Sequence, residues 1–272
     1  MLVQRTLRSV NTLGQMLPHR WRRFLLDKLG LGRMLGRVTA NARDTMVLPN
    51  GLAITFNPLM HWSVVKPEAY EPEVLAVLSR HLEPGMTFYD VGANIGLYAL
   101  MASTEVGPNG RVLAFEPEEN NLRFLKINAK AGRVIDVHGV AVGASDGTVM
   151  FDRRGGAMSG RVMRSGDQAA EAVQVSVRSI DSLVEAGAPP PNAIKIDVEG
   201  LEGDVLKGAT ETLARYRPLL ICEMHLLASD AGPAVDLLRS ANYRLERLDG
   251  TEIAACDAAP PCIIAVPEPS RR

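Results

Sequence analysis

Phe88-Tyr-Asp-Val-Gly-Ala-Asn-Ile-Gly-Leu-Tyr98 is the stretch that decides the fold. An apolar run ends on an acid, and two glycines separated by three residues precede a second apolar segment. The pattern predicts a buried strand ending at Asp90, a tight turn through Gly92 and Gly96, and a helix whose first N–H groups face a ligand. We expect glycine at both positions because a side chain there would block a ligand that approaches the main chain. A tight strand-to-helix turn without a ligand is the alternative.

The spacing of the glycines discriminates between nucleotide cofactors. A dinucleotide site uses three glycines in the order G-x-G-x-x-G, whereas Asn94 occupies the middle position here. The pattern therefore favours S-adenosylmethionine over NAD. A second acid, Glu116, ends the next predicted strand twenty residues after Gly96, where a carboxylate can accept hydrogen bonds from both ribose hydroxyls. Its alternative role is to cap the following helix. The predicted cofactor-binding residues are Asp90, Gly92, Ala93, Asn94, Gly96, Glu116, Pro117, Ala141, Val142 and Asp197.

Strand-like and helix-like segments alternate from residue 71 to the last apolar run. Strands are predicted at 86–91, 111–116, 137–142, 218–225, 243–248 and 262–266, with a further strand around Ile194. This predicts an α/β fold with a doubly wound, mostly parallel, seven-stranded Rossmann-like sheet, one antiparallel edge strand and an N-terminal helical segment. We divide the chain into basic helices and a hairpin (1–66) and the α/β domain (67–272).

Composition narrows the class of protein. Residues 1–43 hold nine Lys or Arg and one acid, a net +8, which leaves 21 basic and 30 acidic residues, a net −9, in the rest. An acidic main body disfavours nucleic acid as a partner. The three cysteines lack paired metal-ligand spacing and argue against a disulfide framework or a zinc site, so we expect a cytoplasmic protein. No transmembrane run or secretory signal is evident, while an organelle transit peptide stays open.

Two segments have several interpretations. The basic residues 1–43 predict two short amphipathic helices separated by Pro18. They could cap a substrate pocket, contact anionic lipid at a membrane surface or an acidic partner, or form a solvated helix pair. The long connection 152–171 is predicted to be a flap on the substrate side, because insertions of this length in a compact domain are usually binding loops or mobile.

Ile194-Lys-Ile-Asp-Val-Glu-Gly200 is the second chemical centre. Charges at alternating positions of a buried strand are costly unless they pair or serve a site. The next strand also ends in ionisable groups, Glu223 and His225. Since the carboxyl edge of an open α/β sheet binds ligands, we predict the catalytic residues Lys195, Asp197, Glu199, Glu223 and His225.

At this point the sequence resembles the FkbM family of S-adenosylmethionine-dependent methyltransferases. The most specific match is Lys195-Ile-Asp-Val-Glu-Gly200 with its trailing Leu206-Lys-Gly208. The other matching pieces are Asp90-Val-Gly-Ala-Asn-Ile-Gly96, Ala114-Phe-Glu-Pro117, Ser179-Ile-Asp-Ser-Leu183 and Glu223. The resemblance covers about residues 70–245 and implies O-methylation of a hydroxyl on a small-molecule, polyketide or sugar-containing acceptor, with S-adenosylmethionine as the cofactor.

An alcohol acceptor must lose its proton, which requires a base near the transferred methyl group. His225 is the first candidate because its ordinary pKa lies closest to neutral, and Asp197 is the rival. Glu199 and Glu223 could orient His225 or the acceptor, and Lys195 could pair with these acids or stabilise a developing alkoxide. A magnesium ion bound by Asp197, Glu199 and Glu223 is a minor alternative. Competing functions are an NAD-dependent oxidoreductase and a non-enzymatic cofactor-binding partner protein.

Overall fold

The structure is a computed structural model, and it describes residues 42–58, 60–61, 71–152, 161–162, 172–198, 200–224, 231–254 and 260–269. The predicted N-terminal helices therefore lie outside the described residues, as does most of the predicted flap. Two predicted catalytic residues, Glu199 and His225, also lie outside them. No helix within the described ranges is long and apolar enough to cross a bilayer.

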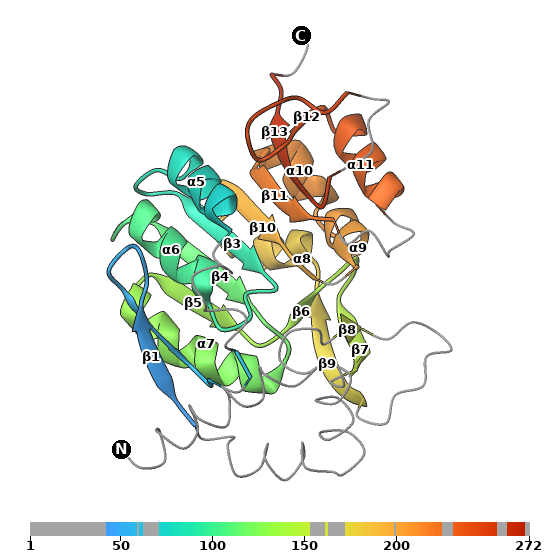
Figure 1. The fold of residues 1–272 in the computed structure, drawn as a ribbon. Helices are drawn as coiled ribbons and strands as arrows, with labels where there is room; N and C mark the ends of the chain where they lie inside the picture. Colours follow the sequence, from blue (N-terminus) through green and yellow to red (C-terminus); the bar gives the residue numbers. More distant parts are fainter. Residues whose placement is uncertain are drawn as a thin grey trace, which may run out of the picture.

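A seven-stranded sheet forms the centre of the molecule, in the order β12-β13-β11-β10-β3-β4-β5 (Figure 1). The parallel strands are β3 (Thr87–Val91), β4 (Arg111–Phe115), β5 (Ile135–His138), β10 (Ala193–Ile196) and β11 (Leu219–Glu223). β13 (Cys262–Pro267) runs antiparallel to both β11 and β12 (Tyr243–Glu246). The predicted antiparallel strand thus lies one position inside the edge, because the last strand inserts between β11 and the edge strand β12.

Helices cover both faces of this sheet, because successive side chains of a strand point to opposite faces and every residue of β3 and β10 is buried. One face packs against α5 (Pro72–His81), α6 (Leu97–Val106) and α7 (Glu119–Gly132), with Phe88 and Val112 among the buried sheet residues. The opposite face packs against α8 (Ile180–Glu185), α9 (Glu202–Lys207), α10 (Thr210–Tyr216) and α11 (Ala231–Ser240). The doubly wound α/β fold is confirmed.

The chain reverses its winding direction between β3 and β10. β4 and β5 lie on one side of β3, and β10 and β11 lie on the other. In open α/β sheets, ligands bind outside the carboxyl ends of the strands at such a switch point. Asp90 of β3 is the register partner of Lys195 of β10, so the two predicted charged centres meet at this position.

A four-stranded sheet, β6-β9-β7-β8, lies beside the main sheet (Figure 1). It consists of β6 (Ala141–Val142), β7 (Gly147–Asp152), β8 (Arg161–Val162) and β9 (Ala172–Arg178). The single strand predicted at 137–142 is therefore wrong: β5 ends at His138, and Ala141 and Val142 pair with β9 in the second sheet.

Residues 202–216 form two short helices, α9 and α10, and Gly208 lies between them. A Cβ at Gly208 would lie 2.1 Å from the carbonyl oxygen of Gly143. The predicted hairpin is present as β1 (Asp44–Val47) and β2 (Ala53–Phe56). It packs beside α7 (Figure 1).

Candidate functional site

The glycine loop, residues 92–96, connects β3 to α6. Gly92, Asn94 and Gly96 have φ angles of +82°, +51° and +90°, a region that favours glycine. A Cβ at Gly92 would lie 1.8 Å from the carbonyl oxygen of Asp197, and one at Gly96 would lie 2.7 Å from the side chain of Leu125. The space that a side chain would need at Gly92 and Gly96 is thus occupied by neighbouring protein segments. The expected approach of a ligand to the main chain of these glycines stays a prediction.

Glu116 lies directly beside this loop, at the end of β4. Its Oε2 accepts a hydrogen bond from the main-chain N–H of Asn94 at 2.9 Å, and its Oε1 accepts one from the N–H of Glu118 at 2.7 Å. Burial raises the pKa of Glu116 to about 7, although these two hydrogen bonds act to lower it. The helix-capping alternative belongs to Glu118, whose carboxylate accepts from the N–H of Asn121. Pro117 precedes this cap rather than starting the helix.

Asp90 is 1% exposed at the end of β3. Neither carboxylate oxygen has a hydrogen-bond partner of regular geometry in the part of the chain that the structure describes. Burial raises the pKa of Asp90 to about 6, and the charge of Lys195 acts in the opposite direction. The main-chain N–H of Ala99, in the first turn of α6, also acts to lower this pKa. A buried carboxylate with so few hydrogen-bond donors is costly, so this position suits a ligand that brings a cation or donors of its own.

Lys195 is the centre of a charged cluster at the ends of β10 and β11. Its Nζ lies 3.2 Å from Oδ2 of Asp197 and 3.1 Å from Oε1 of Glu223. The lysine side chain is 1% exposed, whereas those of Asp197 and Glu223 are 29% and 20% exposed. The structure therefore brings together three predicted catalytic residues, with the cation buried beneath two acids that reach toward solvent.

Burial and charge act in opposite directions on this cluster. Burial disfavours a charged lysine, but the carboxylates of Asp197, Glu223 and Asp90 together raise the pKa of Lys195 well above its usual value. Burial also raises the pKa of Glu223, although the charge of Lys195 opposes this. Lys195 is thus a permanent cation that holds the acids, and Glu223 is a stronger base than an ordinary glutamate.

Tyr98 and Glu71 extend the cluster, and sequence reasoning gave them no role. The Nζ of Lys195 lies 4.5 Å from the centroid of the Tyr98 ring, a cation–π distance. The Tyr98 hydroxyl donates to Oε2 of Glu71 at 2.6 Å. An aromatic residue in the first turn of an apolar helix is typical of a core position, so the sequence held no signal for this contact.

His138 is a third residue near the site for which the sequence predicted no role. It ends β5, and its ring stacks on Phe115 with centroids 4.9 Å apart. Its carbonyl oxygen accepts from the N–H of Glu116 at 3.1 Å. Its buried Nε2 has no hydrogen-bond partner among the described residues. The sequence did hold a signal for the position of His138 near the site, because this histidine ends a parallel strand next to the strand that carries Glu116.

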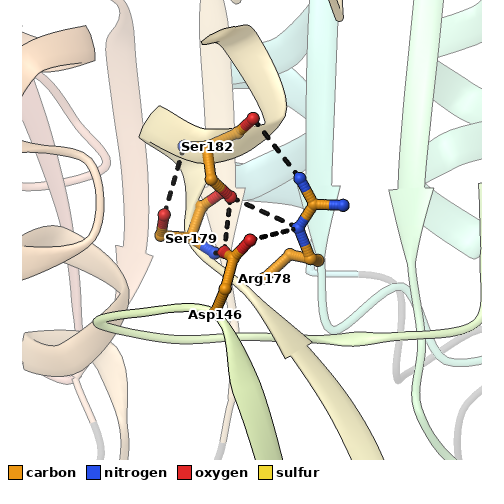
Figure 2. A network of polar contacts seen from close by, with 4 residues as sticks. All are labelled: Asp146, Arg178, Ser179 and Ser182. Carbon is orange, nitrogen blue, oxygen red and sulfur yellow. Dashed lines mark hydrogen bonds and ion pairs between the residues drawn. The ribbon is translucent and has the colours of Figure 1, made fainter. Parts of the chain in front are cut away.

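One of the motifs that carry the family resemblance, Ser179-Ile-Asp-Ser-Leu183, has a structural role. Figure 2 shows Asp146 accepting hydrogen bonds from the N–H of Ser179 and the hydroxyl of Ser182, and pairing with Arg178 at 2.8 Å. Asp181 accepts from the N–H groups of Glu211 and Thr212 and thereby caps α10. The turn at 143–147 thus anchors β9 and α8.

The remaining predicted cofactor-binding residues contribute little exposed surface. Ala93 is buried in the glycine loop, Ala141 and Val142 are buried in β6, and Pro117, next to Glu116, is half-buried. Among the described residues, no group of three or more His, Cys, Asp or Glu side chains could hold a metal ion. The magnesium alternative included Glu199, which is outside them. Cys222 and Cys262 are free thiols.

Comparisons with known proteins give one family and several relatives. The model of the methyltransferase FkbM domain matches residues 90–245. A hexuronic acid methyltransferase from Haloferax volcanii is 34% identical over 160 residues, which are 57% of this chain and 62% of that protein. The chain thus spans less than two thirds of that relative's length.

Two more distant relatives complete the comparison. The 31-O-demethyl-FK506 methyltransferase of Streptomyces tacrolimicus is 27% identical over 231 residues, which are 74% of this chain and 88% of that protein. A crystal structure of a methyltransferase FkbM from Methylobacillus flagellatus is 20% identical, with a TM-score of 0.45, and the match covers 72% of this chain and 51% of that one.

Proposed function

The chain belongs to the FkbM family of methyltransferases, and we propose that it transfers a methyl group from S-adenosylmethionine to a hydroxyl of a sugar-containing or polyketide acceptor. The names of two relatives support this acceptor class, since one is a hexuronic acid methyltransferase and the other is a 31-O-demethyl-FK506 methyltransferase. The alternative of an NAD-dependent oxidoreductase has no support from the family match.

The observation that carries the proposal is the buried Asp90 carboxylate at the switch point of the sheet. Its two oxygens lack partners of regular geometry among the described residues, and S-adenosylmethionine carries an ammonium group and a sulfonium that would supply positive charge there. Glu116 has further lone pairs to accept ribose hydroxyls, because each oxygen uses one main-chain donor. The residues at the ends of β3 and β4 therefore fit this cofactor.

The other proposed cofactor contacts follow from their positions in the chain. The cofactor would lie along the main chain of Gly92, Ala93, Asn94 and Gly96, next to Glu116. Its adenine ring would be bordered by Pro117, Ala141 and Val142, and its methionine part would contact Asp197. Each of these assignments is a proposal that cofactor binding by the corresponding variants can test.

When bound, S-adenosylmethionine supplies an electrophilic methyl carbon for in-line displacement. The residues of the chain would then hold the acceptor, exclude water and remove the hydroxyl proton. We assign His225 as the base that takes this proton, with Glu223 and Glu199 orienting it or the acceptor. Lys195 would keep Asp197 and Glu223 in place through its ion pairs.

Mass spectrometry tests this proposal directly. Cell extracts are incubated with the purified protein and methyl-labelled S-adenosylmethionine, and labelled products are compared with those of the His225→Ala variant. We expect a labelled hydroxyl-bearing product with the wild-type protein and little with the variant. If His225→Ala and Asp197→Asn both bound the cofactor and kept full turnover, the assignment of the base would be wrong.

A further inference from the structure

The glycine loop is held from its far side by residues that precede the family-matched range. Ile95 is fully buried in a cluster with Leu48, Ile54 and Phe56 of the β1–β2 hairpin. The same cluster includes residues from α6 and Phe124 of α7. The side chain of Ile95 in the loop is thus packed into the core that the hairpin helps to build.

Asn128 of α7 connects the hairpin to the loop by hydrogen bonds. Its side chain is 2% exposed. Nδ2 donates to the carbonyl oxygen of Ile95 at 2.8 Å and to that of Thr55 at 2.9 Å, and Oδ1 accepts from the N–H of Thr55 at 2.7 Å. The amide therefore pairs with both main-chain groups of Thr55, as a neighbouring strand would, and uses its second hydrogen on the loop.

We propose that Asn128 is a positioning residue that uses the N-terminal hairpin to keep the glycine loop in its cofactor-binding conformation. The inference rests on the proposed function, because it assigns the loop to the cofactor. It implies that residues 44–56, which precede the family-matched range of 90–245, set cofactor affinity without touching the cofactor.

The geometry of the loop explains why it needs to be held from two sides. Asn94 is a non-glycine residue with a φ of +51°, between two glycines that also have positive φ, and such a conformation persists only when its surroundings enforce it. Glu116 holds the N–H of Asn94 from one side at 2.9 Å. Asn128 and the hairpin cluster hold the carbonyl and the side chain of Ile95 from the other.

Two substitutions separate this role from general stability. Asn128→Ala removes the bond to the loop together with both bonds to Thr55. Asn50→Ala is the matched control, because Asn50 Nδ2 donates to the carbonyl oxygen of Leu100 at 3.0 Å and to the hydroxyl of Thr104 at 2.9 Å. Both variants loosen the hairpin, but only the first releases the glycine loop.

Binding of S-adenosylhomocysteine is measured by calorimetry at a temperature at which the variants are folded. We expect Asn128→Ala to raise Kd about tenfold, because the buried carbonyl of Ile95 loses its donor, and Asn50→Ala to leave Kd within about twofold. Amide hydrogen exchange without any ligand is the second readout. Residues 94–96 should exchange faster in Asn128→Ala than in Asn50→Ala.

The two readouts separate the possible failures. If the wild-type protein did not bind S-adenosylhomocysteine, the proposed function would be wrong, while hydrogen exchange would still decide whether Asn128 holds the loop. Equal Kd values and equal loop exchange in the two variants would overturn the inference. Should Asn128→Ala not fold, Asn128→Asp keeps the acceptor for Thr55 and loses both donors. Failure of both to fold, while Asn50→Ala folds, would also overturn the inference in favour of a purely structural role.

Discussion

Replacing Lys195 with methionine tests the charged cluster at the switch point. Methionine replaces the unbranched lysine chain by an unbranched apolar one and removes the cation between Asp197 and Glu223. The oxygens of these two acids lie 3.2 and 3.1 Å from Nζ. Removing one partner of a buried ion pair costs about 3–5 kcal/mol. The two acids keep part of their hydration, so we expect a loss of about 3 kcal/mol in the free energy of unfolding at pH 8.

The size of this loss should depend on pH in a defined direction. The charge of Lys195 lowers the pKa values of Asp90 and Glu223, which burial raises. Without that charge, both folded-state pKa values rise further above their unfolded values. A carboxyl group shifted upward destabilises the folded protein as pH rises, because folding then requires a buried charge. The deficit of the variant should therefore shrink by about 1 kcal/mol or more between pH 8 and pH 5.

Urea denaturation of the wild-type and variant proteins at both pH values measures these differences. Lys207→Met is the control, because Lys207 pairs with Asp204 at 3.0 Å with both side chains exposed, and such pairs contribute about 0–1 kcal/mol. A loss at Lys195 no larger than that at Lys207, or a loss independent of pH, would refute the reasoning.

Two further predictions concern stability elsewhere in the fold. Burial lowers the pKa of His61 from 6.5 to about 4, so the unfolded state alone gains a proton between these values, and stability should fall by about 3 kcal/mol as pH drops through this window. His61→Gln should lack this loss. If the free energies of unfolding of the wild-type and variant proteins fell equally from pH 7 to pH 4, the assignment to His61 would be wrong. Gly92→Ala should prevent folding or cost more than about 3 kcal/mol, because its methyl group would meet the carbonyl oxygen of Asp197. Gly51→Ala has the same φ of +82° but open space around it, so it should cost only about 1–2 kcal/mol. Thermal unfolding of both variants measures these losses, and equal losses would show that the Gly92 contact is unimportant.

The sequence predicted the parts of the fold that follow from periodicity and turn residues. The apolar runs before Asp90 and Glu116 are β3 and β4, and the mixed segment around Lys195 is β10. Alternating charges on that strand correctly predicted that Lys195 and Asp197 lie together, because residues two apart share one face of a sheet. Glu223 was expected beside them because the carboxyl ends of parallel strands meet at one edge of the sheet, and its carboxylate does contact Lys195. The position of β13 inside the edge depends on long-range pairing, for which a single sequence holds no direct signal.

The features that the sequence missed arise from contacts between distant segments. Gly92 and Gly208 look like turn glycines, but each makes room for a carbonyl group of a segment remote in the chain. Asn128 lies within a helix, and nothing local indicates that its amide would bond to Thr55 and Ile95. Tyr98 has the sequence pattern of a core residue. Its contact with Lys195 could not be predicted, because the two residues are far apart in the chain.

Ligand binding by the wild-type protein tests the central claim most directly. S-adenosylhomocysteine and NAD are each titrated into the protein, with thermal unfolding followed in parallel. We predict saturable binding of S-adenosylhomocysteine and a rise in Tm that grows with its concentration, and no effect of NAD. Stabilisation by NAD, or no response to S-adenosylhomocysteine, would contradict the assignment of Asp90, Glu116 and the glycine loop to an S-adenosylmethionine site.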